Sequence, residues 1–163
     1  KAVYDNSMVY ITPTMTEIDA LIDAGSDAIA MDATDRVRPD GQSITEFFCE
    51  VREKYPNMIF MADCATEEDA LRAETLGFDM AGTTLRGYTA ETKGISTPDI
   101  NLIKKLSEKL NIPLIAEGGI WEREQLTDVF INGAYAAVVG TAITRPRDIT
   151  RRFVESISER LHE

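Results

Sequence analysis

IPLIAEGGI at residues 112–120 and AAVVGTAITRP at residues 136–146 decide how this chain folds. In each stretch a short apolar run, typical of a strand, ends in a glycine turn that leads into a helix. Glycine lets the backbone approach a ligand closely, and the free N–H groups of a helix start attract anions, phosphate above all. We therefore predict an anion site at these two turns. Its candidate residues are Gly118, Gly119, Gly140, Thr141 and Arg145.

The composition limits the classes of partner. The chain has 163 residues, enough for one domain, with 44% hydrophobic and 28% charged residues. Its 17 basic and 28 acidic residues give a net charge of −11, which argues against binding nucleic acid or an anionic membrane through bulk charge. An anionic substrate would need a local patch, which Arg145 and Arg147 offer.

The two cysteines do not form a disulfide framework and predict reduced thiols. Cys49 lies in an apolar helical stripe and is expected in the core. No signal peptide is visible, and no apolar run approaches the ~20 residues that a membrane span needs. A cytoplasmic location is the expectation.

Apolar runs and helical patterns alternate along the whole chain. Strands are predicted to start near residues 27, 58, 78, 113 and 136, each followed by a helix. This order predicts a parallel sheet, and the continuous apolar runs predict cover on both of its faces. No linker divides the chain, so residues 1–163 are expected to be a single domain.

Two α/β architectures fit this pattern. An open doubly wound sheet suits the length, because a (β/α)8 barrel takes about 250 residues and eight strands. The paired glycine turns suit the barrel, whose phosphate sites use the loops after its last two strands.

Two local predictions concern single residues. Pro98 is predicted to open a helix, and Arg36 and Arg38 are expected in a solvated loop.

Several uncommon runs together resemble one family, the N-acetylmannosamine-6-phosphate 2-epimerases. The resemblance covers essentially all of the chain, in the family's order. The runs that carry it are KAVY at residue 1, VYITPTMTEID, AMDATDRVRPDG, KYPN, MADCAT, TTLRGYT, IAEGGI and VVGTAITRP. The resemblance implies a cytoplasmic, commonly dimeric (β/α)8 TIM barrel, of which this chain would cover the end of strand 3 through helix 8, with the N-terminal part missing.

The resemblance also implies a reaction and its residues. The family inverts C2 of N-acylmannosamine 6-phosphate through removal and return of a proton, in sialic-acid catabolism, with no metal or other cofactor. Lys1 and Glu117 would be the proton-transfer groups, Asp63 would hold the lysine or a sugar hydroxyl, and Thr84 would contact substrate. Asp32 is a similar but weaker case than Asp63.

Other interpretations of these residues stay open. By local sequence alone, Glu117 also fits a carboxylate that accepts hydrogen bonds from the start of the next helix. Asp63 also fits a residue that caps a turn, and Lys1 also fits a solvated terminus. The alternative enzymes are phosphosugar-binding barrels of aldolase or decarboxylase type, with Lys1 as the one candidate for Schiff-base chemistry. A non-catalytic fragment that binds a phospho-ligand is the alternative from another class.

Overall fold

A computed structural model of the chain describes the backbone of residues 10–161 and the side chains of residues 10–157. Its helices are α1 Met15–Asp23, α2 Ile44–Lys54, α3 Glu67–Leu76, α4 Ile100–Lys109, α5 Arg123–Ile131, α6 Thr141–Thr144 and α7 Pro146–Leu161. Its strands are β1 Ala28–Asp32, β2 Ile59–Asp63, β3 Met80–Gly82, β4 Leu114–Glu117 and β5 Ala136–Val138.

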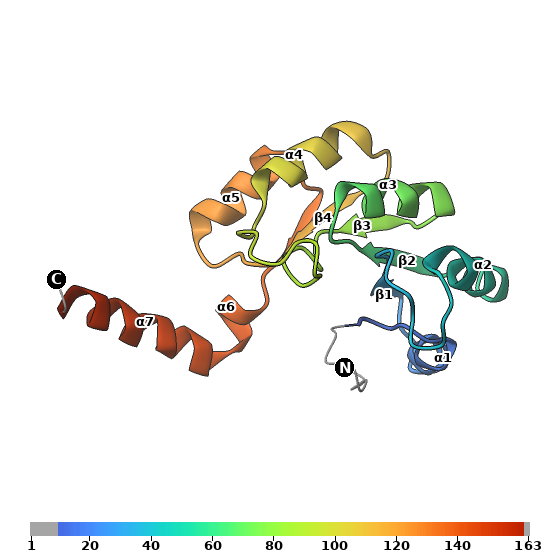
Figure 1. Ribbon diagram of the computed structural model, residues 1–163, viewed down its shortest axis with the longest axis horizontal. Coiled ribbons are helices and arrows are strands. Elements are labelled where there is room, and N and C mark those ends of the chain that lie inside the picture. The colour runs from blue at the N-terminus through green and yellow to red at the C-terminus, as the bar shows by residue number, and fades with distance from the viewer. Residues whose placement is uncertain (1–9, 162–163) are drawn as a thin grey trace.

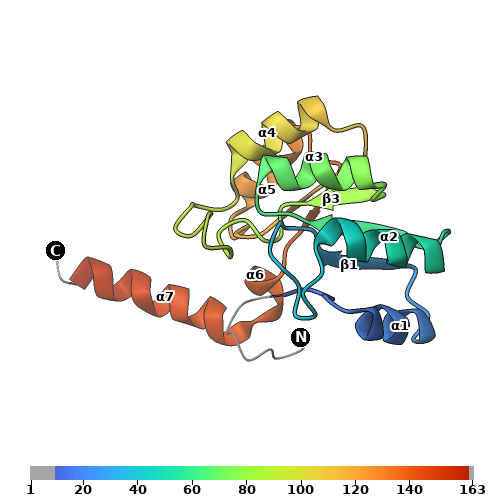
Figure 2. The ribbon, with the colours of Figure 1, turned by 45° about the vertical axis from the view of Figure 1, so that its right-hand side comes forward.

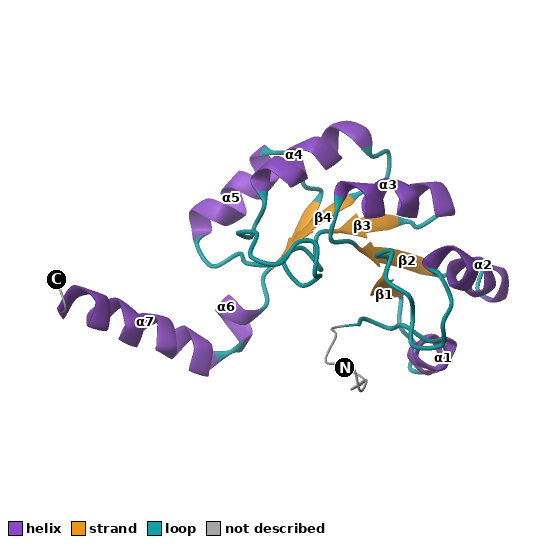
Figure 3. Ribbon diagram, in the orientation of Figure 1, coloured by secondary structure: helices purple, strands orange, loops and turns teal. Residues whose placement is uncertain are grey.

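The five strands form one parallel sheet in the order β1-β2-β3-β4-β5. This confirms the predicted alternation. Helices α2 to α5 lie in an arc along one side of the sheet (Figures 1 and 3). A doubly wound sheet instead carries helices on both faces and reverses its strand order at a switch point. The observed order is therefore that of a barrel wall.

The register aligns the ends of neighbouring strands. Asp32 lies beside Asp63, Asp63 beside Gly82, and Glu117 beside Val138. Because the strands are parallel, all their carboxyl ends meet at one edge of the sheet. This edge is where ligand sites form in parallel α/β folds.

Local sequence sets most helix boundaries. Capping boxes that start at Thr14, Ser43 and Thr66 open α1, α2 and α3. The prediction for Pro98 was wrong. Helix α4 begins two residues later at Ile100, because the Asp99 side chain accepts a hydrogen bond from the backbone N–H of Leu102 and so caps the helix.

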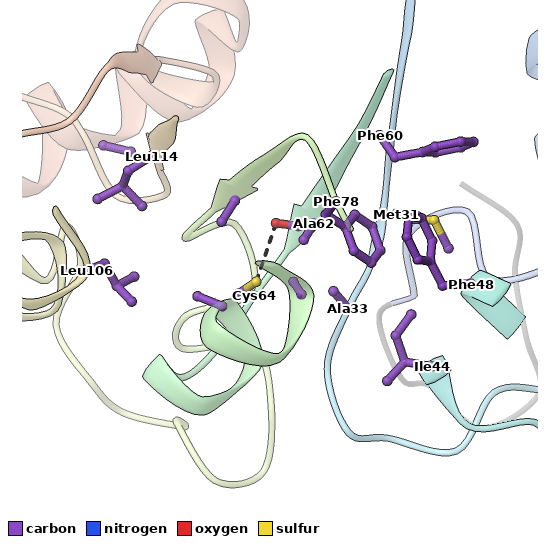
Figure 4. Close-up of a cluster of buried hydrophobic side chains, with 14 of the residues drawn as sticks. Met31, Ala33, Ile44, Phe48, Phe60, Ala62, Cys64, Phe78, Leu106 and Leu114 are labelled. Carbon is purple, nitrogen blue, oxygen red and sulfur yellow. Dashed lines mark hydrogen bonds between the residues drawn. The ribbon is translucent and has the colours of Figure 1, made fainter. Parts of the chain in front are cut away.

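The core lies between the sheet and its helices (Figure 4). Phe48 of α2 stacks on Phe78 with ring centroids 3.7 Å apart and meets Phe60 of β2 edge-on at 5.6 Å. Burying each such ring contributes about 1.5–3 kcal/mol to the stability of the fold.

The two cysteines differ in burial. Cys64 is buried, but Cys49 is exposed, so the expectation of a core Cys49 was wrong. It lies next to Phe48 on the helix, on the side that turns to solvent.

The other face of the sheet is less covered than predicted. Along β1 and β2, Ile29 and Phe60 face the helices and are buried, whereas Ala30 and Met61 alternate with them and are only half-buried. Within residues 10–161 no second helical layer covers this face. The expectation of a sheet buried on both sides is therefore not met by the described part of the chain.

Helix α7 projects away from the sheet in two views (Figures 1 and 2). Its apolar residues Phe153, Val154 and Ile157 are 70%, 56% and 59% exposed. Arg152 holds the first half of α7 against the segment before α5. It forms an ion pair with Glu122 at 2.6 Å, and its guanidinium lies over the Trp121 ring. Among the described residues, no helix has the length and apolarity that crossing a membrane requires.

Candidate functional site

A cavity of about 490 Å³ lies at the carboxyl ends of the last strands. It joins the segments that follow β3, β4 and β5 with a residue near the start of the described chain. Its lining residues are Ile11, Thr84, Leu85, Tyr88, Thr97, Glu117, Gly118, Gly119, Ile120, Trp121, Val138, Gly140 and Thr141. Six of the residues predicted from the sequence therefore meet around one space: Thr84, Glu117, Gly118, Gly119, Gly140 and Thr141.

Glu117 is held at this cavity by its backbone. Its N–H donates to Thr83 Oγ1 at 3.0 Å, and the Thr83 hydroxyl donates to the Glu117 carbonyl at 2.9 Å. The side chain is thus free to point at the cavity rather than to cap a helix. Burial raises the pKa of Glu117, and a hydrogen bond from Thr84 partly opposes the rise. A carboxyl with a raised pKa is suited to exchange protons near neutral pH.

Asp63 ends β2, two strands from Glu117 on β4, and lies outside the cavity lining. The Thr84 hydroxyl is 2.5 Å from Asp63 Oδ1 and 3.2 Å from Glu117 Oε2, so it connects β2 to β4. Burial raises the pKa of Asp63 to about 7, the Thr84 hydrogen bond opposes this, and the charges of Glu117 and Asp32 add to it. Two carboxyls whose pKa values are both raised by burial therefore lie on either side of one hydroxyl.

Asp32, the weaker candidate, has a different environment. Its Oδ2 accepts from Arg36 Nη2 at 2.5 Å, and its Oδ1 accepts from the backbone and the hydroxyl of Thr34. Asp32 thus holds the loop after β1.

The arginines of this loop are less solvated than expected. Arg38 is buried and donates to the carbonyls of Asp32 and Pro13, and this burial lowers its pKa to about 10.

The first glycine turn is closely packed. Gly118 and Gly119 have φ of 106° and 69°, the left-handed region that favours glycine. A Cβ on Gly119 would lie 2.2 Å from Thr97 Oγ1 and 2.4 Å from the Thr97 carbonyl oxygen. The chain before α4 therefore passes directly over this turn. Helix α5 starts only at Arg123, so the turn does not lead straight into a helix as predicted.

The second turn is open. Gly140 precedes the four-residue helix α6, which begins at Thr141, and a Cβ on Gly140 would meet nothing within 4 Å. Both residues line the cavity, but Arg145 does not. The Arg145 side chain is 66% exposed and lies 3.9 Å from Asp148. The structure therefore brings the two glycine turns together and leaves the predicted arginine outside the lining.

The sequence predicts the loop that holds Tyr88 as a substrate contact or a lid, and Tyr88 lines the cavity. It missed Leu85 of the same loop and Trp121, which follows the first glycine turn. The unusual length of that loop was the available signal, since long loops in compact domains are often functional. Lys1, the second predicted proton-transfer group, lies outside the described residues.

Comparison with known proteins shows the family of the chain. Residues 1–159 match the family described as "Putative N-acetylmannosamine-6-phosphate epimerase". The chain belongs to this family. Relatives described as "Putative N-acetylmannosamine-6-phosphate 2-epimerase" include one from Caldanaerobacter subterraneus subsp. tengcongensis, 50% identical over 98% of this chain and 68% of its own length. One from Malacoplasma penetrans is 49% identical over 96% of this chain and 69% of its own length.

A solved structure extends the likeness to three dimensions. The N-acetylmannosamine-6-phosphate 2-epimerase from Clostridium perfringens superposes with a TM-score of 0.86 at 44% identity, over 94% of this chain and 66% of that one. The chain thus spans about two thirds of the length of these epimerases. Among the described residues, no group of His, Cys, Asp and Glu side chains has the arrangement of a metal site.

Proposed function

We propose that the protein containing this chain epimerises N-acylmannosamine 6-phosphate to N-acylglucosamine 6-phosphate. The observation that carries the proposal is the Glu117 carboxyl, half-buried with a raised pKa and facing a cavity whose walls include both glycine turns. Family membership supplies the substrate class.

The chemistry follows from the acidity of C2. In the open-chain sugar, C2 is next to the C1 carbonyl, so its proton can be removed to give an enolate-like intermediate. Inversion requires that a proton return on the opposite face, which takes two proton-transfer groups or one mobile group. Glu117 is one of these groups, and Lys1 is proposed as the other by resemblance. The C1 oxygen that gains charge also needs a hydrogen-bond donor.

The two glycine turns are proposed to hold the 6-phosphate. Gly118 and Gly119 on one side and Gly140 and Thr141 on the other expose backbone at the cavity wall. Arg145, exposed one residue after α6, is proposed to turn toward the bound phosphate, since a guanidinium fork matches phosphate oxygens. In this arrangement the phosphate end of the sugar lies at the two turns, and C2 lies near Glu117.

We further propose that the chain is the strand 3 to helix 8 portion of a (β/α)8 barrel. The sequential parallel order, the helices along one side and the half-buried inner residues Ala30 and Met61 all fit a barrel wall. Strand β5 has no neighbour beyond it within residues 10–161, and Val138 on it is 41% exposed. Two further strand–helix units together with strand 3 would close the eight-stranded wall between β5 and β1.

A homodimer and a cytoplasmic location complete the proposal. Helix α7 exposes three large apolar side chains, those of Phe153, Val154 and Ile157. An exposed apolar patch of this kind is typical of an interaction surface rather than of a helix that faces solvent. A second copy of the chain is proposed to cover them. Light scattering on the complete protein should give twice the subunit mass, and a monomeric mass at micromolar concentration would rule this out.

Proton exchange at C2 tests the function directly. The complete protein is incubated with N-acetylmannosamine 6-phosphate in deuterated water, and C2 is followed by NMR. We expect epimerisation with deuterium at C2. If neither appears, the protein is not this epimerase, whereas cleavage of a carbon–carbon bond or loss of carbon dioxide would point to the aldolase or decarboxylase alternative. Phosphosugar binding without any turnover would point to a non-catalytic protein.

Glu117→Gln tests the role of the carboxyl. The amide keeps the size of the side chain but cannot take up a proton, so turnover should fall by at least 10³-fold, within the range of lost acid–base catalysis. Binding of the phosphosugar, measured by calorimetry, should change by less than about threefold. The matched control is Glu124→Gln, an exposed residue on α5, which should keep full activity. Normal turnover of Glu117→Gln would assign Glu117 a structural role.

A further inference from the structure

Thr84 occupies an unusual position between two carboxyls. Its hydroxyl lies 2.5 Å from Asp63 Oδ1, at the end of β2, and 3.2 Å from Glu117 Oε2, at the end of β4. The strand between them, β3, ends at Gly82, where a Cβ would come within 3.1 Å of the Thr84 hydroxyl oxygen and 3.5 Å of Asp63 Oδ1. The absence of a side chain at Gly82 leaves the room in which this bridge forms.

Proton counting gives the bridge a consequence. A threonine hydroxyl has one proton and two acceptor lone pairs. Thr84 can therefore donate to only one of the two carboxyls at a time. The other carboxyl makes a hydrogen bond with Thr84 only if it carries a proton itself and donates to Oγ1. The three groups can thus share two protons, one on the hydroxyl and one on a carboxyl.

We propose that Thr84 is a positioning residue that passes protons between Glu117 and Asp63, so that buried Asp63 serves as the proton store for Glu117 during epimerisation. This rests on the proposed function. In the forward step, the O–H bond of protonated Glu117 breaks as its proton binds Thr84 Oγ1, and the original Thr84 O–H bond breaks as that proton binds Asp63 Oδ1. Glu117 is left as a carboxylate and Asp63 neutral. The reverse step restores the starting state, so no other reactant is needed.

The charges around the bridge favour one shared carboxyl proton. On β1, Asp32 faces Asp63 but is paired with Arg36 at 2.5 Å. On α3, Asp69 is paired with Arg72 at 2.6 Å. No described cation pairs with Asp63 or Glu117, while burial raises the pKa of both. Two ionised carboxyls on either side of one hydroxyl would repel each other, so one of them holds a proton near neutral pH.

A titration without substrate tests the bridge. The side-chain carboxyls of Asp63 and Glu117 are followed by carbon-13 NMR in the complete protein, its Thr84→Val and Thr84→Ser variants, and the control Thr75→Val, an exposed threonine on α3. Valine removes the hydroxyl and keeps the shape, so we expect the pKa of both carboxyls to rise. Serine keeps the hydroxyl and should restore both. If Thr84→Val moves neither carboxyl, or only Asp63, the bridge is wrong.

Kinetics test the relay. Thr84→Val should lower kcat by about 10–100-fold, less than the roughly 10²–10⁴-fold of a lost acid–base group because Glu117 remains, and change KM by less than about threefold. Thr84→Ser should recover most of kcat. The opposite pattern, in which serine is impaired and valine is normal, would show a packing role, and a loss confined to KM would show substrate binding; either would overturn the relay. If the wild type does not epimerise at all, the proposed function fails, while the titration still decides whether Thr84 links the two carboxyls.

Discussion

The two ends of the cavity differ in how tightly they are packed, although their sequence patterns are alike. Both are built from a short apolar strand and a glycine turn. At the β4 end, Glu117 is fixed by Thr83 and the turn is packed against Thr97. At the β5 end, Gly140 has no neighbour that an added Cβ would meet within 4 Å, and Arg145 is mostly exposed. The proposed proton transfer by Glu117 thus takes place at the rigid end, while the proposed phosphate site spans the rigid turn and the open one.

Within residues 10–161 the difference follows the pairing of the strands. Strand β4 pairs on both sides, with β3 and β5, whereas β5 pairs only with β4 among the described residues. A strand inside a sheet has neighbours that fix its end and the loop beyond it. An outer strand has them on one side only. The four substitutions below test this contrast, from the largest expected effect to the smallest.

Gly119→Ala should have the largest effect on stability. The new Cβ would lie 2.4 Å from a backbone oxygen of Thr97, and alanine disfavours a φ of 69°. Strain and overpacking together should lower the free energy of unfolding by about 2–5 kcal/mol, measured by urea denaturation. A loss below about 1 kcal/mol would show that the β4 turn is no more rigid than the β5 turn.

Asp63→Asn should stabilise the protein in a pH-dependent way. The pKa of Asp63 is about 7 when folded against a reference value of 3.8. The folded state therefore binds the proton more tightly, so wild-type stability falls as pH rises from about 4 to about 7. Asparagine cannot ionise and escapes this loss. Its advantage in unfolding free energy should grow by about 2–3 kcal/mol between pH 5 and pH 8.

Urea denaturation at these two pH values measures the change, and Asp27→Asn is the control because this residue is exposed. An advantage for Asp63→Asn that stays constant with pH would mean that Asp63 is ionised throughout, as it would be if Lys1 pairs with it. The double variant Lys1→Met, Asp63→Asn would then separate the two contributions.

Arg145→Ala should weaken substrate binding and leave the fold intact. Loss of one phosphate contact should raise KM about tenfold, equivalent to about 1.4 kcal/mol, with kcat changed less than twofold. Stability should change by less than about 0.5 kcal/mol because its ion pair with Asp148 is long and exposed. Arg147→Ala, 84% exposed, is the comparison and should have a smaller effect on KM. Equal effects would indicate a diffuse positive patch.

Gly140→Ala should have the smallest effect on stability. Its φ is −93°, which side-chain-bearing residues also adopt, and the added Cβ would meet nothing within 4 Å. We expect a loss below about 1 kcal/mol by urea denaturation. A loss as large as that of Gly119→Ala would show that the β5 turn is packed in the complete protein by segments beyond the described chain.

The sequence alone determined most of the elements and predicted six of the residues that line the cavity. Apolar runs and helical patterns located the strands and the first helices, because such signals act within a few residues. The strand ends located Glu117, Asp63 and both glycine turns. The α/β class and the parallel sheet followed from the alternation, and the runs shared with the family indicated the reaction.

Only the tertiary structure decided how these parts meet. The hydroxyl of Thr84 reaches two carboxyls because β2, β3 and β4 lie side by side, with sequence separations of 21 and 33 residues. No local pattern states which side chains neighbouring strands bring together. Burial is also set by distant residues. Arg38 is buried although it was expected in a solvated loop, and Cys49 is exposed although it was expected in the core. Electrostatics depend on that burial, so the raised pKa values of Asp63 and Glu117, from which the proposed proton relay draws support, are properties of the fold.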